Sequence, residues 1–488
     1  MFPENSFFRR QMTMLVALVL YLFTPVLLAG EQADRAISAV QQLKQQDSLA
    51  GDTTLSIMVK QGNVANFLGE NHLLKQLWEA QTGISLDVQV MPQQASLEVV
   101  RHSHNIDLTI ARNREYADLR NEGLIADLTP FYQRYGFELG GGDEAYVLPK
   151  MQAYLGDRIV AVPADGDIAI LYLRHDLLED PDHQVGYRER FKQPLRVPET
   201  WQEYQQQIEY FHGIEPGFSG SLEQRNEQAG WMFWMPRYAA QSMPNQYLFD
   251  DQMKPLVNSV EGIAATESYL ATVEFSPKGI LDQGNGYTFT LPQFILGKGY
   301  STVITLAGAK LFNGINSKVK GKYIAVPMPG KQINGQVHRR TTLIYGNNIV
   351  IPSKSKNADL AFLFAMWLTD PDISVKSVAV TGGFADPYRQ HHYSHPELIN
   401  TYSESVLKAV SDQLNQVVPA GTGLPGDKEY IAVLNKELHR AALGRQSAAK
   451  AMANVEQAWE AITERFGREA QRQRWLEIKQ NYPGATAR

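Results

Sequence analysis

A polar bend between two apolar runs, within residues 158–176, constrains the fold more than any other stretch of the sequence. The two runs are short and rich in β-branched residues, and residues 164–167 separate them. This pattern predicts two strands joined by a bend. Pro163 cannot donate to a sheet ladder and Gly166 accepts unusual dihedral angles, so the chain can change direction there. A bend with two carboxylates suits a segment that passes between two lobes and faces their cleft, although the local pattern equally allows an ordinary surface hairpin.

The length and composition of the chain predict a globular protein with more than one core. The 488 residues are enough for two or three domains or for two large lobes. A formal charge of −6 argues against nucleic acid as a partner, because no basic face is evident. The absence of cysteine excludes disulfides, thiolate metal sites, thiol nucleophiles and a lipid-modified N-terminal cysteine.

The N-terminus has the features of a secretory signal peptide. Arg9 and Arg10 precede an apolar run over about residues 14–29 that ends in small residues. The run is short for a membrane span and Pro25 interrupts it, although an uncleaved anchor is the alternative. We therefore expect residues 1–30 to direct export to the periplasm, followed by an amphipathic helix within 31–50.

Strands and helices alternate after this helix. Residues 54–59, 84–90 and 106–110 are predicted strands with helical segments between them, which is the rhythm of a parallel sheet covered by helices. In such sheets ligands bind beyond the carboxyl ends of the strands. Residues 60–63 and 111–114 both follow strand ends, so we expect them to share one rim.

Two further segments point to a cleft. The aromatic run at residues 230–235 is explained either by a buried helix face or by a surface on which a flat apolar ligand face stacks. Residues 345–348 precede the predicted strand 349–351, and this order predicts a second passage between the lobes.

Over about residues 51–465 the chain resembles the extracellular solute-binding proteins of ABC importers, in the branch that carries sugars and maltodextrins. The resemblance depends on the order and spacing of its pieces. These are Val162, Pro163, Asp165 and Asp167 with Leu171 and Tyr172; Val197 and Pro198 with Trp201 and Tyr204; Met253, Lys254 and Pro255 with Phe294, Gly297 and Lys298; and Ile351 and Pro352 with Phe364, Trp367 and Pro371.

The resemblance implies an α/β protein with a two-lobed periplasmic-binding-protein type II fold. Each lobe would be a mostly parallel sheet flanked by helices, with crossing segments that act as a hinge. A solute would bind in the cleft, and the closed form would be recognised by the membrane permease of an ABC importer. We expect a monomer without cofactor or metal. The expected division is 1–30 signal peptide, 31–50 N-terminal helical extension, 51–164 and 327–374 lobe 1, 165–326 and 375–470 lobe 2, and 471–488 C-terminal tail.

The resemblance also implies a set of cleft residues. Amide and carboxylate side chains bind pairs of sugar hydroxyls, and aromatic rings cover the apolar faces of pyranose rings. Two positions depart from the sugar-binding pattern: residues 345–347 read Tyr-Gly-Asn where Gly-Gly-Trp is common, and residues 307–309 lack a tryptophan often found there. The expected ligand-binding residues are Lys60, Asn63, Arg112, Asn113, Asp165, Asp167, Trp231, Trp234, Tyr287, Asn347, Asn348, Phe384, Asp386 and Tyr430.

Several other functions remain alternatives. The solute could be an amino acid or a polyamine, or the protein could report to a sensor kinase. Asp165 and Asp167 could act as the acid and base of a carbohydrate-active enzyme, but no Gly-x-Ser-x-Gly elbow, phosphate-binding loop or zinc-binding helix motif accompanies them. His391, His392 and His395 could share a cation, but no nearby carboxylates complete a metal site, so we expect none.

Overall fold

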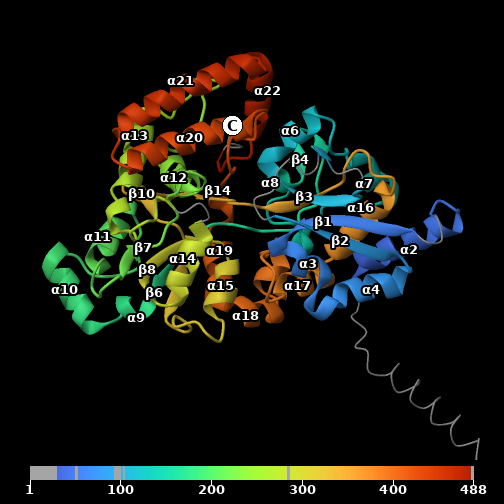
Figure 1. Ribbon diagram of the computed structural model, residues 1–488, viewed down its shortest axis with the longest axis horizontal. Helices are drawn as coiled ribbons and strands as arrows, with labels where there is room; N and C mark the ends of the chain where they lie inside the picture. Colours follow the sequence, from blue (N-terminus) through green and yellow to red (C-terminus); the bar gives the residue numbers. More distant parts are fainter. Residues whose placement is uncertain (1–29, 50–52, 93–100, 103–104, 283–285, 485–488) are drawn as a thin grey trace, which may run out of the picture.

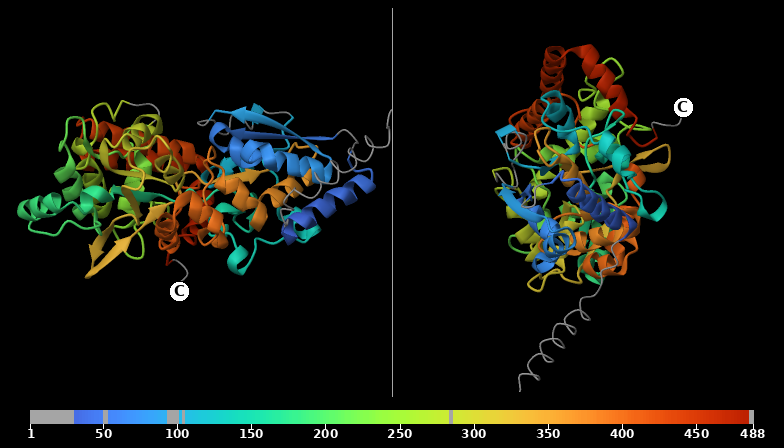
Figure 2. Two further views of the ribbon diagram at one scale, coloured as in Figure 1. Left: turned by 90° about the horizontal axis from the view of Figure 1, so that it is seen from below. Right: turned by 90° about the vertical axis from the view of Figure 1, so that its right-hand side faces the viewer.

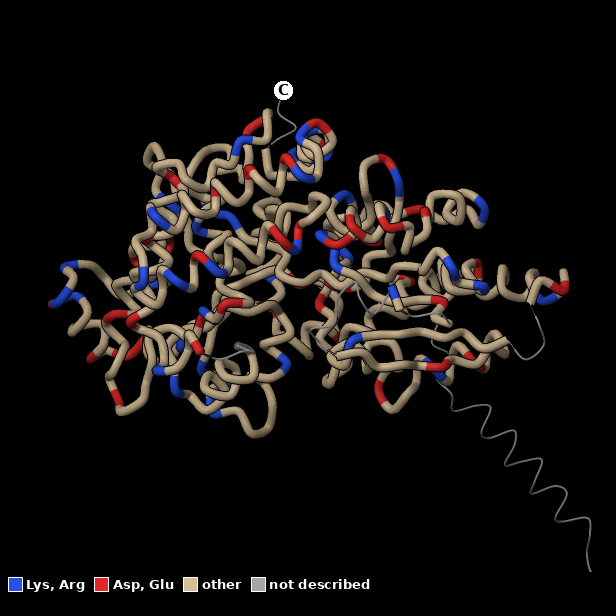
Figure 3. The backbone as a smooth tube through the Cα atoms, turned by 45° about the horizontal axis from the view of Figure 1, so that its top comes forward, with Lys and Arg blue, Asp and Glu red and all other residues tan. Residues whose placement is uncertain are grey.

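Two α/β lobes lie side by side and are joined by chain segments that pass between them (Figures 1 and 2). The arrangement comes from a computed structural model, which describes residues 30–49, 53–92, 101–102, 105–282 and 286–484. The predicted signal peptide, up to residue 29, lies outside this part of the chain. None of the described helices is both long and apolar enough to pass through a bilayer. Acidic and basic residues are interspersed over both lobes in the view of Figure 3.

The first lobe contains a sheet whose described strands have the order β13-β3-β1-β2. Strand β1 runs parallel to β2 and β3, while β13 is antiparallel to β3. The register pairs Ile57 with Leu108, so β1 and β3 end at the same edge of the sheet, as the strand pattern predicted. The strands are β1 (Thr54–Lys60), β2 (Ser85–Met91), β3 (Leu108–Arg112) and β13 (Asn347–Val350), and the short pair β4 (Tyr154–Leu155) and β5 (Arg158–Ile159) lies beside them.

Helices cover this sheet, and one of them is apolar on every side. Residues 360–368 of α16 are all buried, which fits a helix that is enclosed by other elements. The N-terminal helix α2 packs on α16, and its Ala33 N–H donates to Asp370 at 3.0 Å. The helices are α2 (Glu31–Gln45), α3 (Val64–Leu68), α4 (Leu73–Thr82), α6 (Tyr116–Asn121), α7 (Thr129–Tyr135), α8 (Pro149–Gln152), α16 (Ala358–Leu368) and α17 (Pro371–Ala379).

The second lobe contains a mixed sheet whose described strands have the order β7-β8-β6-β9. Strands β7 and β8 are parallel, and β6 is antiparallel to both of its neighbours. The strands are β6 (Ile170–Arg174), β7 (Ser219–Ser221), β8 (Gly299–Ile304) and β9 (Tyr323–Val326). The helices nearby are α9 (His175–Leu178), α10 (Pro181–Phe191), α11 (Trp201–Phe211), α12 (Gly230–Ala239), α13 (Val260–Leu270), α14 (Gly286–Ile295), α15 (Ala307–Phe312), α18 (Pro396–Tyr402) and α19 (Glu404–Ser411).

Three long C-terminal helices complete the described chain at the second lobe: α20 (Asp427–Ala442), α21 (Ala448–Phe466) and α22 (Arg468–Lys479). They form the red group at the top of Figure 1, where α22 lies over the gap between the lobes. The predicted tail thus begins inside α22, whose Trp475 is fully buried and packs edge-on to Phe249.

The crossing segments run side by side between the lobes. Val162 exchanges two backbone hydrogen bonds of 2.9 Å with Ile349, and the carbonyl of Asp167 accepts from Ile344 at 2.8 Å. A further segment lies against them, because Gly166 donates to the carbonyl of Asp386 at 3.1 Å. The polar bend therefore lies between the two lobes.

Gly166 has a packing reason to be glycine. A Cβ atom there would lie 1.8 Å from the carbonyl oxygen of Pro387 in the neighbouring crossing segment. The apolar run before the bend differs from the prediction, because it forms an isolated bridge at Val162 in place of a continuous strand. Its residues leave one sheet to enter the other, so they have no partner strand along most of their length.

Residues 330–342, which follow β9 and precede β13, contact the second lobe. The expected division assigned residues 327–374 to the first lobe. Residues 330–342 form the hairpin β10 (Gly330–Ile333) and β11 (Gln336–Arg339), then β12 (Thr341–Thr342), which pairs with β14 (Val417–Val418). The Gly330 N–H donates to the carbonyl of Glu199 at 2.8 Å, and Lys331 donates to Gln241 at 2.7 Å.

Candidate functional site

The end of β1 contributes a buried lysine to the space between the lobes. Lys60 is 1% exposed, and its ammonium donates to the Asn347 side chain at 2.9 Å. Burial first, and then the charge of Arg112, lowers the pKa of Lys60 to about 7, although Glu115 and Asp167 oppose the shift. Lys60 and Asn347, which the sequence placed in the cleft, therefore lie together.

The end of β3 contributes two arginines that reach across to other segments. The Arg112 guanidinium lies 5.0 Å from the centre of the Tyr345 ring, in a crossing segment. Arg114 follows in the 3₁₀ turn Asn113–Glu115, where its guanidinium lies 5.5 Å from the Trp231 ring of the second lobe and pairs with Asp427 at 2.9 Å. These contacts join the rim of the first lobe directly to α12 and α20.

The second lobe presents the loop 222–229 and the start of α12 to this rim. Trp231 is 2% exposed, and its backbone N–H donates to Asn435 at 3.0 Å. The Tyr287 ring of α14 lies 6.0 Å from the Tyr345 ring. Gln224 lies near the Tyr287 hydroxyl, although the two make no hydrogen bond of standard geometry.

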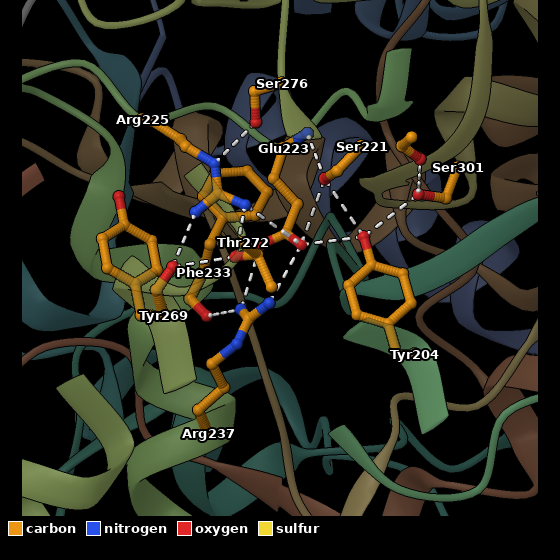
Figure 4. Close-up of polar contacts among 11 residues, drawn as sticks. Tyr204, Ser221, Glu223, Arg225, Phe233, Arg237, Tyr269, Thr272, Ser276 and Ser301 are labelled. Atoms are coloured by element: carbon orange, nitrogen blue, oxygen red, sulfur yellow. Dashed lines mark hydrogen bonds and ion pairs between the residues drawn. The ribbon is translucent and has the colours of Figure 1, made fainter. Parts of the chain in front are cut away.

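A fully buried ion cluster anchors this loop (Figure 4). Both carboxylate oxygens of Glu223 accept from Arg237, at 2.9 and 3.0 Å, and Arg225 lies 3.6 Å away. Tyr204 also donates to Glu223, at 2.8 Å. Burial alone would raise the pKa of Glu223, but the two arginines outweigh it and lower the pKa to about 2. Because Glu223 and Arg225 are held in this way, the position of Gln224 between them is fixed.

Several buried polar atoms around the rim have no hydrogen-bond partner. Buried polar groups are nearly always paired, so each unpaired atom needs an explanation. Two of these atoms belong to the second lobe, and the others belong to the strand ends of the first. They are Asn63 Oδ1, Arg112 Nε, Arg114 Nε, Gln224 Nε2 and the Tyr287 hydroxyl.

The predicted acidic residues lie at the crossing segments. Asp165 accepts from the Asp386 N–H at 2.9 Å and from the Asn347 side chain at 3.3 Å, and Asp167 accepts from the Gly346 N–H at 3.3 Å. Burial, and next Asp386, raises the pKa of Asp165 to about 7. Burial also raises the pKa of Asp167. These carboxyls hold the crossing segments together through backbone and side-chain hydrogen bonds.

Lys310 supports the same crossing from the second lobe. Its ammonium is enclosed by carbonyl oxygens, including those of Val378 at 2.7 Å and Gly383 at 2.9 Å. Burial raises the pKa of Asp386 to about 7, with Asp167 adding to the shift and Lys310 opposing it. The cluster is a polar joint between the lobes.

Other predicted residues lie away from the rim or have local partners. Trp234 is fully buried in the second lobe, where it stacks on Tyr238 at 4.4 Å and donates to Thr266. Tyr430 is buried among the C-terminal helices, where its hydroxyl lies 2.8 Å from that of Thr463. The remaining three are Asn113, whose amide donates to Met151; Asn348, which donates to the Gly346 carbonyl; and Phe384, which is 42% exposed and whose N–H donates to Gly62.

The histidines of the possible metal site each have a local partner. His391 lies 2.9 Å from the Pro371 carbonyl, and His392 lies 2.9 Å from the Ser374 hydroxyl. His395 accepts from the N–H of Glu397 at the start of α18. Within the described residues, no group of three His, Cys, Asp or Glu side chains is arranged to hold a metal ion.

A pocket of about 860 Å³ lies between α22 and the first lobe. Lys150, Tyr154 and Asp157 of the first lobe line it opposite Arg474 and Glu477 of α22. None of the predicted site residues lines it. The pocket is therefore a separate feature at the side of the interlobe gap.

Sequence reasoning missed four residues of the rim: Arg114, Gln224, Tyr345 and Asp427. Arg114 and Tyr345 fall within segments already singled out, beside chosen residues. Gln224 lies in the loop before α12, and Asp427 is the first residue of α20; no local sequence pattern marks either residue. Their role becomes visible once the two lobes are seen together.

The protein has two α/β lobes that are linked by crossing segments, and polar side chains from both lobes meet between them. This arrangement is typical of a two-lobed binding protein. Residues 70–374 match the family of bacterial extracellular solute-binding proteins, and the chain belongs to this family. It is therefore a solute-binding protein, a class without enzymatic activity.

Solved structures of binding proteins have the same fold. The solute-binding protein of Agrobacterium radiobacter K84, in complex with ribitol, superposes with a TM-score of 0.69 at 19% identity over 84% of this chain and 98% of that one. Maltose-bound MalE3 of T. maritima superposes with a TM-score of 0.67 at 19% identity, over 84% of this chain and 100% of that one. The sugar-binding protein MalE of Xanthomonas citri superposes with a TM-score of 0.65 at 18% identity, over 85% of this chain and 98% of that one. No curated protein sequence matches the chain significantly.

Proposed function

We propose that this protein binds a mono- or oligosaccharide between its lobes and delivers it to the permease of an ABC importer. The observation that carries the proposal is the group of buried, unpaired polar atoms on Asn63, Arg112, Gln224 and Tyr287. They come from both lobes and lie where the β1 and β3 strands end, which is where α/β sheets bind ligands. A solute with several hydroxyl groups would give these atoms hydrogen-bond partners.

Aromatic rings beside the polar groups suit a sugar. Trp231, Tyr287 and Tyr345 lie around the same rim, and their rings can cover the apolar face of a pyranose. Similar structures support this class of solute, since their bound ligands include ribitol, maltose, D-mannitol and α-D-tagatose.

Binding would be coupled to closure of the lobes. The Arg114–Asp427 ion pair and the hydrogen bond of 2.8 Å from the Gly426 N–H to Asp118 form only when the lobes are together. A solute that contacts both lobes stabilises that state because the open form lacks those contacts. The crossing segments are the place where the hinge would bend.

The place of action would be the periplasm. The family is extracellular, and the N-terminal 30 residues have the sequence features of an export signal. The closed monomer would dock on the permease and would then release the solute to the permease.

A thermal-shift screen tests the proposal. Purified protein is heated with sugars, polyols, amino acids and polyamines, and a solute at 100 times its dissociation constant should stabilise the fold by about 2.7 kcal/mol. We expect sugars or polyols to raise the melting temperature. If amino acids or polyamines alone raise it, the sugar assignment is wrong and the binding scaffold stands.

A further inference from the structure

The two cations at the strand ends form no direct ion pair with a carboxylate among the described residues. Among the described residues, no carboxylate lies within 4.0 Å of the Lys60 ammonium or of the Arg112 guanidinium, whereas Arg114 beside them is paired with Asp427. The contacts of Lys60 and Arg112 are an amide oxygen and an aromatic ring. Placing unpaired cations in a buried site is costly unless something supplies the missing charge.

The remaining charges around the rim offset only part of this positive charge, and burial lowers the pKa of Lys60 to about 7, so a bound anion would favour its charged form. Glu115, in the turn after Arg112, accepts from the Arg112 backbone N–H at 2.9 Å; burial would raise its pKa, but Arg112, Lys60 and Arg114 outweigh it and lower the pKa. Asp167 lies at the hinge, where burial raises its pKa and so disfavours its charged form. Three cations, counting Arg114, therefore face Glu115 and Asp427.

We propose that the solute carries an anionic group, a carboxylate or a phosphate, which Lys60 and Arg112 bind at the carboxyl ends of β1 and β3. This inference rests on the proposed function, because it assumes that a saccharide occupies the space between the lobes. The planar Arg112 guanidinium can donate two parallel hydrogen bonds to such a group, and Lys60 adds a second positive charge. Tyr287, Gln224 and Trp231 would contact the sugar ring.

The same geometry favours the binding of acidic sugars over the binding of basic solutes. A polyamine would place ammonium groups beside Lys60 and Arg112, in a site that already has an excess of cations, which like-charge repulsion disfavours. A neutral sugar would satisfy the unpaired polar atoms but would leave the positive charge of Lys60 and Arg112 uncompensated. The anionic group is the feature that would complete the site.

Matched pairs of sugars test the inference. The melting temperature and the dissociation constant are measured with D-galacturonate against D-galactose, D-glucuronate against D-glucose, and D-glucose 6-phosphate against D-glucose, together with digalacturonate and maltose. We expect an acidic member to bind at least about tenfold more tightly than its neutral partner. The uronates and the phosphate separate a carboxylate from a phosphate as the anion.

Variants tie the preference to the two residues. Arg112→Gln and Lys60→Met should each reduce the preference for the acidic sugar to less than about threefold, and the melting temperature of the ligand-free protein should stay the same or rise. Arg134→Gln removes an exposed arginine of the same lobe, which pairs with Asp359, and should leave the preference unchanged.

The outcomes separate the two proposals. Equal or tighter binding of neutral sugars would overturn the anionic group and leave saccharide binding intact. An acidic preference that survives in both variants would remove Lys60 and Arg112 from the recognition. If none of the sugars binds while amino acids do, the proposed function fails and the inference fails with it.

Discussion

Both lobes hold arginines near the binding rim, but the two groups differ in burial and in their carboxylate partners. In the second lobe, the fully buried Glu223 accepts from Arg237 and Tyr204 and lies 3.6 Å from Arg225. In the first lobe, Arg112 lies over an aromatic ring without a carboxylate partner among the described residues. The second-lobe arginines thus share a carboxylate of the fold, whereas no carboxylate of the described residues pairs directly with Arg112.

This difference in pairing distinguishes residues that stabilise the fold from residues that we propose bind the solute. The Glu223 cluster fixes the loop 222–229, and so it acts on ligand binding through the position of Gln224. Lys60 and Arg112 lie at strand ends of the first lobe, where they contact Asn347 and Tyr345. Removing a charge should therefore destabilise the second lobe, while in the first lobe it should alter binding more than stability.

The largest expected effect is on the paired cluster. Glu223→Gln leaves two buried arginines without a countercharge and should lower the free energy of unfolding by about 3–5 kcal/mol, measured by urea denaturation. Glu209→Gln breaks an exposed pair with Arg190 and should cost less than about 1 kcal/mol. Equal losses in the two variants would show that the cluster is not the scaffold of this lobe.

The next effect is the pH dependence of stability that arises from the hinge carboxyls. The pKa of Asp165 is raised from 3.8 to about 7, so between these values the folded protein holds a proton that the unfolded chain has released. Stability should therefore fall as pH rises through this window, by up to about 4 kcal/mol for a shift of this size.

The measurement is the free energy of unfolding between pH 4 and pH 8, at fixed ionic strength. Asp165→Asn should flatten the slope, whereas Asp157→Asn, at a 92% exposed side chain, should preserve it. A wild-type protein that gains stability over this window relative to Asp165→Asn would contradict the assignment.

A smaller effect is expected from the contact that joins the two regions. Asp427→Asn keeps an oxygen for the turn at Thr422 but removes the charge that pairs with Arg114. The closed state should become less populated, and solute affinity should fall about five- to tenfold by calorimetry. Asp412→Asn, in an exposed pair with Lys408 at the C-terminal end of α19, is the control. Unchanged affinity for Asp427→Asn would mean that this pair does not favour closure.

Much of the fold follows from local pattern. The predicted strands 54–59, 84–90 and 106–110 correspond to β1, β2 and β3 within one or two residues, because alternating apolar residues and polar breaks mark them. Lys60 and Arg112 were found for the same reason, since the strand-end rule needs only the strands. The run before the polar bend was mispredicted as a strand, because its pairing depends on the distant Ile349.

The remaining part of the site depends on how the lobes meet. Arg114 and Asp427 are more than 300 positions apart, and nothing in either segment predicts their ion pair. Trp234 and Trp231 belong to one aromatic run, but helix geometry turns the first into the core and the second toward Arg114. The sequence alone cannot show which of two neighbouring aromatic residues faces the core and which faces the rim, because tertiary packing sets the direction of each side chain.

Closure of the lobes around a solute is tested most directly by an interlobe distance. The chain has no cysteine, so Val90→Cys in the first lobe and Ile315→Cys in the second, both at exposed positions, allow two spin labels to be attached specifically. The distance distribution is measured by pulsed electron paramagnetic resonance with and without the solute that the thermal screen selects. We predict that binding shortens and narrows the distribution. An unchanged distribution under conditions where calorimetry detects saturated binding would contradict closure.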